Sequence, residues 1–245
     1  MALGLDTTRR LLVALGRPDL RPATVIHVAG SNGKGTVCAL LAATAQAEGH
    51  TTLLFTSPHV ARIEERIRVN GRPVEAGMFD RAVLRVKACA EDLNLEPTFF
   101  ETTMLVAWAV SDAVNAEVVV QETGLGGRLD ATRATRADLS IVTSISVEHA
   151  SLLGTTRAEV MVEKAAIARP GKPLLLRDPE DGKVLEAARR TAERAGDHDL
   201  DDDGPASDVT VVTVPADVDV RDEAVRLAKA ACTILGWSAD ELDDL

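Results

Sequence analysis

Hydrophobic and polar positions follow two different rhythms along this chain. Short runs rich in β-branched residues are typical of buried strands and lie at 24–29, 51–55, 117–122, 139–144, 172–176 and 209–214. Apolar residues at helical spacing predict helices at the N-terminus and over 36–48, 77–93, 102–115, 157–168 and 222–235. Since strands that alternate with helices form βαβ units, the pattern predicts an α/β fold with a mostly parallel β-sheet flanked by helices.

The composition changes near residue 196. Five aspartates fall within the eleven residues DHDLDDDGPAS, from Asp197 to Ser207. We expect a solvated linker here rather than a metal-binding tract, because runs of like charge repel one another and stay hydrated. The chain is therefore expected to divide into a domain over 1–195 and a segment over 196–245. That segment would consist of the acidic linker and a final strand and helix that complete the domain.

Charge and apolar content exclude several classes of partner. The chain has 27 Lys and Arg against 38 Asp and Glu, a formal net charge of −11, and aromatic residues make up 2%. A nucleic-acid backbone needs a basic face and exposed bases need aromatic platforms, so nucleic acid is not an expected partner. No run approaches the roughly 18 apolar residues of a membrane span. Three isolated cysteines complete the expectation of a soluble, cytoplasmic protein.

A glycine-rich segment, GSNGKGT at 30–36, lies between a predicted strand and a predicted helix. In that context the backbone amides converge on phosphate oxygens, Lys34 reaches the β- and γ-phosphates, and the Thr36 hydroxyl ligates Mg²⁺. The strict phosphate-loop spacing is not met, because Val28 occupies the first glycine position and Gly35 separates Lys34 from Thr36. The pattern still favours nucleotide binding over an ordinary turn. The candidate nucleotide-binding residues are Ser31, Asn32, Gly33, Lys34, Gly35 and Thr36.

The string VIHVAGSNGKGT resembles the phosphate loop of folylpolyglutamate synthase, a member of the Mur-ligase superfamily of ATP-dependent amide ligases. The resemblance continues through TSPH at 56–59, ERIRVNG at 65–71, FE at 100–101, ETGLGGRLDAT at 122–132 and EKA at 163–165. It implies a P-loop NTPase-like Mur-ligase central domain over residues 1–195. It also implies an enzyme that uses ATP to phosphorylate a small-molecule carboxylic acid, forming an acyl phosphate that an amine or amino acid attacks.

The same resemblance implies a set of site residues. Glu122 ends the strand EVVVQE, which places its carboxylate at the carboxyl edge of a parallel sheet, where a hard oxygen ligand suits Mg²⁺. The resemblance implies magnesium ligands at Thr36, Ser57, Glu122, His149 and Lys164, and catalytic roles for Lys34, His149 and Lys164. Lys164 would be carbamylated, which requires a depressed pKa and partial burial. The alternative for Lys164 is a surface salt bridge with Glu163 or Glu159.

Members of the resembled family are longer and carry a second domain, which leaves three interpretations open. The first is an amide ligase whose second domain comes from a partner protein or another copy in a homo-oligomer. The second is a stand-alone enzyme that phosphorylates a carboxylate. The third is a regulatory ATP-binding protein without turnover. Residues 57–71 are expected to form a loop. The resemblance implies that this loop and the FE segment border the substrate, an anionic or aromatic carboxylic acid that need not be a folate, and the alternative is a solvated mixed-charge surface. The helix at 222–235 is a candidate for an exposed docking surface.

Overall fold

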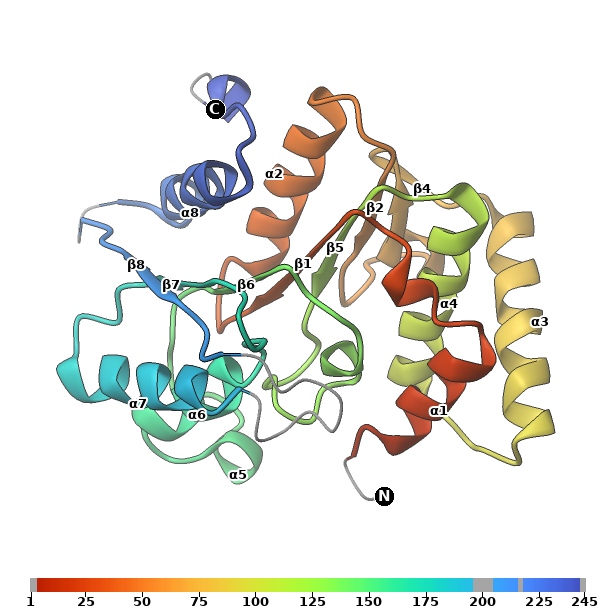
Figure 1. The fold of residues 1–245 in the computed structure, drawn as a ribbon, viewed down its shortest axis with the longest axis horizontal. Coiled ribbons are helices and arrows are strands. Elements are labelled where there is room, and N and C mark those ends of the chain that lie inside the picture. Colours follow the sequence, from red (N-terminus) through yellow and green to blue (C-terminus); the bar gives the residue numbers. More distant parts are fainter. Residues whose placement is uncertain (1–3, 196–204, 216–217, 243–245) are drawn as a thin grey trace.

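The computed structural model of this chain describes residues 4–195, 205–215 and 218–242 (Figure 1). These residues contain one sheet of eight strands in the order β4-β3-β2-β5-β1-β6-β7-β8. The pairs β2–β5, β5–β1, β1–β6, β6–β7 and β7–β8 are parallel, and the pairs β2–β3 and β3–β4 are antiparallel. The expected α/β fold with a mostly parallel sheet is confirmed. Most of the expected acidic linker, 196–204, lies outside the described residues.

The strands follow the hydrophobic runs of the sequence closely. Their bounds are β1 Thr24–Ala29, β2 Thr52–Phe55, β3 Ile67–Val69, β4 Arg72–Pro73, β5 Val118–Glu122, β6 Leu139–Val142, β7 Leu174–Arg177 and β8 Val209–Val212. The expectation of a loop throughout 57–71 was wrong at its end, because β3 pairs with β2 there and its Ile67 is fully buried. A strand of three residues carries too little of a period-two pattern to be recognised in a segment dominated by charge.

The helices cover both faces of the sheet and give three layers (Figure 1). Their bounds are α1 Asp6–Ala14, α2 Lys34–Ala47, α3 Ala76–Asp92, α4 Phe99–Val114, α5 Ala150–Leu153, α6 Arg157–Ala165, α7 Gly182–Glu193 and α8 Val220–Leu235. In β1, Ile26 and Val28 pack into the core under α2 and α8, whereas Val25 and Ala29 pack into the cores on the other face. Burial of β1 on both faces matches its continuous apolar run and its central place in the sheet.

The final helix does not form the exposed docking surface that its apolar spacing suggested. Leu227, Ala228 and Ala231 of α8 are buried against α2, in the same core cluster as Leu41. The helix therefore lies against α2 with its apolar residues in the core. No helix within the described residues is both long and apolar enough to cross a bilayer.

Candidate active site

The carboxyl ends of β1, β2, β5 and β6 meet at one edge of the sheet, and the sequence motifs follow directly from them. β1 leads into the segment 30–33 and then into α2, with β5 and β6 as its parallel neighbours on either side. Side chains that follow adjacent parallel strands therefore converge around the start of α2. Ligands of open α/β sheets bind at this kind of crevice, outside the carboxyl ends of the strands.

The phosphate-loop segment is held in a defined conformation by residues that follow β6. The Ser31 amide donates a hydrogen bond to the Ser144 carbonyl at 2.8 Å, and the Ser146 amide donates to the Ser31 hydroxyl at 3.0 Å. Gly33 precedes α2 in the left-handed conformation, with φ of 80°, and offers no side-chain acceptor to the first turn. The amides at the positive end of α2 are therefore open to an anion.

Lys34 folds back over the loop from the first turn of α2. Its Nζ donates to the Gly30 carbonyl at 3.0 Å and to the Ser31 carbonyl at 3.4 Å. Asn32 and Thr36 are exposed beside it. These contacts are weak enough to exchange for a phosphate oxygen, which would form a shorter, charge-assisted hydrogen bond with the same ammonium group.

Glu122 ends β5 and lies beside the start of α2, on the side away from the segment that follows β6. The side chain is buried, with 5% of its surface exposed, and Oε2 accepts a hydrogen bond from the Ser57 amide at 3.0 Å. Burial raises the pKa of this carboxyl above its usual range, against the opposing effects of the Ser57 hydrogen bond and the Lys34 charge. A groove of about 490 Å³ runs past Gly35, Ser57 and Glu122. A buried carboxylate with one amide donor is suited to a cation.

Lys164 lies on the β6 side of the phosphate loop and is 2% exposed. Its Nζ donates to the Gly30 carbonyl at 2.9 Å and to Glu148 Oε1 at 2.7 Å. Burial lowers the pKa of its ammonium group, against the opposing effect of Glu148. The alternative of a surface salt bridge was wrong, because Glu163 pairs with Arg128 and Glu159 caps α6. Glu148 as the partner could not be found by helical spacing, since it lies on a different segment.

His149 stands at the start of the short helix α5, with φ of 46°. The residue is exposed, and with Glu148, Lys164 and Lys34 it lines a small cavity of about 60 Å³ next to the loop. Within the described part of the chain, no group of three or more His, Cys, Asp and Glu side chains could hold a metal ion. The expected ligand set is of a different kind, because it combines one carboxylate with hydroxyl groups on one side of the loop and a histidine with a modified lysine on the other.

A larger cavity of about 500 Å³ adjoins the same edge. Phe100, Leu125 and Leu153 give it apolar walls, and Arg66 and Asp130 are among its polar lining residues. The alternative of a solvated surface was wrong for Arg66. Its side chain is 8% exposed, its Nε donates to His59 Nδ1 at 2.9 Å, and its guanidinium lies 5.3 Å from the Phe99 ring centroid. Neither of these two neighbours carries a carboxylate that would neutralise the guanidinium, and Arg66 therefore contributes a positive charge to the cavity lining.

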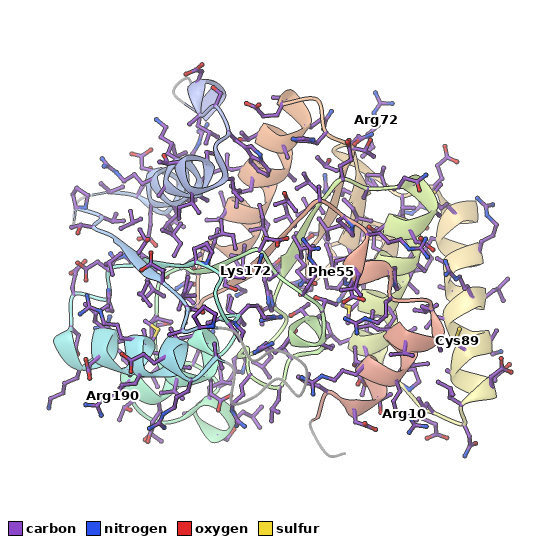
Figure 2. The ribbon with its side chains drawn as sticks, viewed as in Figure 1. Arg10, Phe55, Arg72, Cys89, Lys172 and Arg190 are labelled. Carbon is purple, nitrogen blue, oxygen red and sulfur yellow. The ribbon has the colours of Figure 1, made fainter. Side chains whose placement is uncertain are left out.

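A cavity of about 960 Å³, larger than those at the carboxyl edge described above, lies elsewhere, at the amino ends of β6 and β7. It is lined by basic side chains that include Arg136 and Lys172, and both of these pair with Asp138 (Figure 2 labels Lys172). None of the motif residues lines it. Size alone therefore does not identify the site in this molecule.

Comparisons with known proteins find both similar sequences and similar structures. The dihydrofolate synthase/folylpolyglutamate synthase of Escherichia coli strain K12 is 38% identical over 179 residues, which cover 73% of this chain and 42% of the relative. The structure of E. coli FolC in complex with DHPP and ADP matches with a TM-score of 0.83 and 28% identity, over 99% of this chain and 60% of that chain. A bifunctional folylpolyglutamate synthase/dihydrofolate synthase with Mn, AMPPNP and L-glutamate bound matches with a TM-score of 0.74 and 29% identity, over 87% and 48% of the two chains. No family model matches the chain. The chain spans less than half the length of the curated relative.

Proposed function

We propose that this chain, a homologue of the folylpolyglutamate synthases and dihydrofolate synthases, binds ATP with Mg²⁺ and uses it to activate a carboxylic acid for attack by an amine. The observation that carries the proposal is the convergence of the phosphate loop, Glu122 and Lys164 at one edge of the sheet. These groups come from β1, β5 and α6, which are far apart in the sequence. Their meeting at one loop is what a site for a polyanion and its counter-cation requires.

The loop and the start of α2 would hold the phosphates. The positive end of α2 has no side-chain cap and would face the phosphates, and Lys34 would exchange its two carbonyl contacts for phosphate oxygens. Phosphoryl transfer needs positioning and charge neutralisation more than covalent help from the protein. Lys34 is therefore the residue whose positive charge would do most to neutralise the transferred phosphoryl group.

The residues beside the loop fit a magnesium ion. Glu122 is a buried carboxylate whose hydrogen bond within the described residues comes from a neutral amide. Ser57 lines the same groove, and Thr36 follows Gly35, which lies next to the Glu122 carboxylate. Hard oxygen donors of this kind are the ligands that Mg²⁺ prefers. When bound, Mg²⁺ supplies charge neutralisation for the phosphate oxygens. Glu122, Ser57 and Thr36 would hold the ion on the β2 side of the loop.

Lys164, Glu148 and His149 would form the second part of the site. Carbamylation of Lys164 requires the neutral ε-amine, which attacks CO₂ and loses a proton, and burial favours this form by lowering the pKa. The product would place a carbamate opposite Glu148, which now accepts a hydrogen bond from Nζ at 2.7 Å. Two anions in contact need a cation between them, and His149 lines the same small cavity. We propose that the carbamylated Lys164, Glu148 and His149 would together hold a second divalent ion.

The carboxylic acid would lie in the 500 Å³ cavity that adjoins the loop. Phe100 and Leu125 would contact an aromatic or apolar body, and Arg66 would face its acidic group. By analogy with the enzyme names of the relatives and with the L-glutamate bound in one related structure, a folate and L-glutamate are the first acid and amine to test. The three unpaired cysteines within the described residues fit the reducing conditions of the cytoplasm, where we place the reaction.

We propose that a partner, either another polypeptide or another copy of this chain, covers the site. The chain spans 42% of the Escherichia coli relative. Large apolar side chains are exposed around the carboxyl edge, at Val60, Phe99, Leu125, Val147 and Leu152. An apolar rim around a polar site is typical of a surface that another domain covers. The two remaining interpretations are a stand-alone kinase for carboxylates and a regulatory ATP-binding protein.

Release of ADP tests the proposal. The purified chain is incubated with ATP and Mg²⁺, alone and with a folate and L-glutamate, and the mass of the chain in solution is measured in parallel. ADP release that depends on the acid supports a carboxylate-activating enzyme, and a new amide product supports a complete ligase. Binding of ATP without release in any mixture favours the regulatory alternative. Absence of ATP binding at millimolar concentration contradicts the proposed function.

A further inference from the structure

Gly30 and Thr143 are packed against each other more tightly than side chains allow. Gly30 has φ of 143°, and a Cβ atom added there would lie 1.8 Å from Thr143 Oγ1 and 2.9 Å from Thr143 Cβ. Thr143 is 1% exposed and follows directly after β6. Position 30 therefore has room only for glycine, and the residue that fills the space is the threonine.

The Thr143 hydroxyl makes a hydrogen bond that reaches into the phosphate loop. Its Oγ1 donates to the Asn32 carbonyl at 2.6 Å, while its backbone amide donates to the Ala29 carbonyl at 2.9 Å. One residue thus binds the loop on both sides of Gly30. The next hydrogen bond, from the Ser31 amide to the Ser144 carbonyl, continues the β1–β6 ladder beyond the ends of both strands.

This packing also determines where the Gly30 carbonyl points. That single oxygen accepts hydrogen bonds from Lys34 Nζ at 3.0 Å and from Lys164 Nζ at 2.9 Å. Two ammonium groups that share one acceptor repel each other, so their common position depends on an accurately aimed carbonyl. A peptide unit that moved by an ångström would lose one of the two lysines.

We propose that Thr143 is a positioning residue for nucleotide binding: its hydroxyl group holds the Gly30–Asn32 backbone in the conformation that aims Lys34 at the phosphates and fixes the Gly30 carbonyl that Lys164 contacts. This proposal rests on the proposed function for its effect on ATP. Its effect on the loop does not depend on any ligand. Thr143 is 1% exposed and its hydrogen bonds go to the loop backbone, so we assign it a role that acts through the loop.

Two substitutions separate the hydroxyl from the shape of the side chain. Thr143→Val keeps the branched shape and removes the hydrogen bond to Asn32, whereas Thr143→Ser keeps the hydroxyl and removes the methyl. Thr44→Val is the matched control, because Thr44 is another buried threonine, on α2, whose hydroxyl binds the Leu40 carbonyl of the same helix at 3.1 Å. It loses the same kind of hydrogen bond away from the loop.

The experiment measures two quantities for each variant. Hydrogen exchange of peptides that contain residues 30–34 is followed without nucleotide, relative to exchange in the core strand β5, and the dissociation constant for ATP with Mg²⁺ is measured by calorimetry. We expect Thr143→Val to speed exchange in the loop about fivefold to tenfold and to weaken ATP binding by a similar factor, as loss of one hydrogen bond would give. Thr143→Ser and Thr44→Val should stay within about twofold of the parent chain, since neither loses the loop hydrogen bond.

Equal loop exchange in Thr143→Val and the parent chain overturns the proposal, whatever happens to ATP. If the parent chain does not bind ATP but loop exchange is still faster in Thr143→Val than in the parent, the positioning role is supported and the proposed function is contradicted. A uniform rise in exchange throughout the sheet means that Thr143 contributes only to global stability, which also overturns the proposal. If Thr143→Val fails to fold, Thr143→Ala is measured against Thr44→Ala with the same criteria.

Discussion

Replacing Glu122 by Gln tests the carboxylate beside the phosphate loop with little change of shape. The amide oxygen of Gln can accept the same hydrogen bond that Ser57 now donates at 3.0 Å. Because burial raises the pKa of Glu122 in the folded state, the unfolded chain releases this proton first as the pH rises. The free energy of unfolding therefore falls as the pH rises from the pKa of Glu122 in the unfolded chain to its higher pKa in the fold, and this loss of stability remains at pH 7. We expect Glu122→Gln to unfold at the same temperature as the parent chain or higher when no ligand is present.

The effect of ligand should have the opposite sign. ATP with Mg²⁺ at about 100 times its dissociation constant stabilises a binding-competent fold by about 2.7 kcal/mol. A chain of this size gains about 2–4 °C in unfolding temperature for each kcal/mol, so the parent chain should shift by about 5–10 °C. A hundredfold weaker affinity in Glu122→Gln leaves about 0.4 kcal/mol at the same concentration, which is a shift of about 1–2 °C. The variant would be at least as stable alone and far less responsive to nucleotide.

The measurement is a thermal unfolding scan with ATP and Mg²⁺, with ATP and a chelator, and with neither. Glu117→Gln is the matched control, because Glu117 lies at the amino end of the same strand and accepts a hydrogen bond from the Thr51 amide at 2.8 Å, as Glu122 does from Ser57. The control should keep the full shift. A full shift in Glu122→Gln that disappears on chelation would refute the assignment of Glu122 to the cation.

Three further predictions concern other charged residues. Lys34→Met should weaken ATP binding at least tenfold in calorimetry with an unchanged unfolding temperature, because Lys34 binds only carbonyls of its own loop; equal affinity would contradict its role. Lys164→Ala should abolish ATP turnover, with no rescue by bicarbonate, while Lys172→Ala keeps it; full activity in Lys164→Ala would exclude the carbamylated role. Asp138→Asn should lower the free energy of unfolding by about 1–3 kcal/mol at pH 7. Although Asp138 is partly buried, hydrogen bonds from Arg136, the Val25 amide and Lys172 lower its pKa, so its contribution is present above about pH 4 and lost as the pH falls below that value. Urea unfolding at pH 7 and at pH 3 should therefore show a difference between parent and variant that shrinks in acid, and a difference independent of pH would contradict the ion pair.

Local patterns carried most of the fold. β1 was predicted at its observed bounds, because a run of apolar residues between a turn and a glycine-rich loop is unambiguous in a parallel sheet. Helix α7 was missed although Asp181 caps it through the Lys183 and Val184 amides and its apolar residues have helical spacing, so a signal was present in the sequence. The short helix α5 has no comparable signal, since it consists of a single turn after His149.

The site was predictable in its parts but not in its contacts. The sequence predicted that the phosphate loop and Glu122 lie together, because strand ends of a parallel sheet share an edge. The metal-binding and catalytic roles of Glu122, His149 and Lys164 came from the resemblance to a known family and stay predictions. The Lys164–Glu148 pair joins α6 to the segment after β6, and no spacing rule links positions on separate elements. Arg66 is buried by Phe99, which comes from the start of α4. Contacts of this kind depend on how elements pack, and a single sequence records them only through motifs that are already known.

The central place of β1 also governs how the molecule folds. β1 pairs with β5 and β6, whose residues Val118 and Leu139 face Thr24 and Ile26 from far along the chain. Closing such long loops is slow, and the two parallel pairings can form only after most of the chain has been synthesised. The turn after β1 gains its supports from β6 at that same late stage, so a nascent or half-folded chain cannot capture nucleotide. Ligand would then act on the rate of unfolding rather than on the rate of folding, and unfolding kinetics with and without ATP would show this directly.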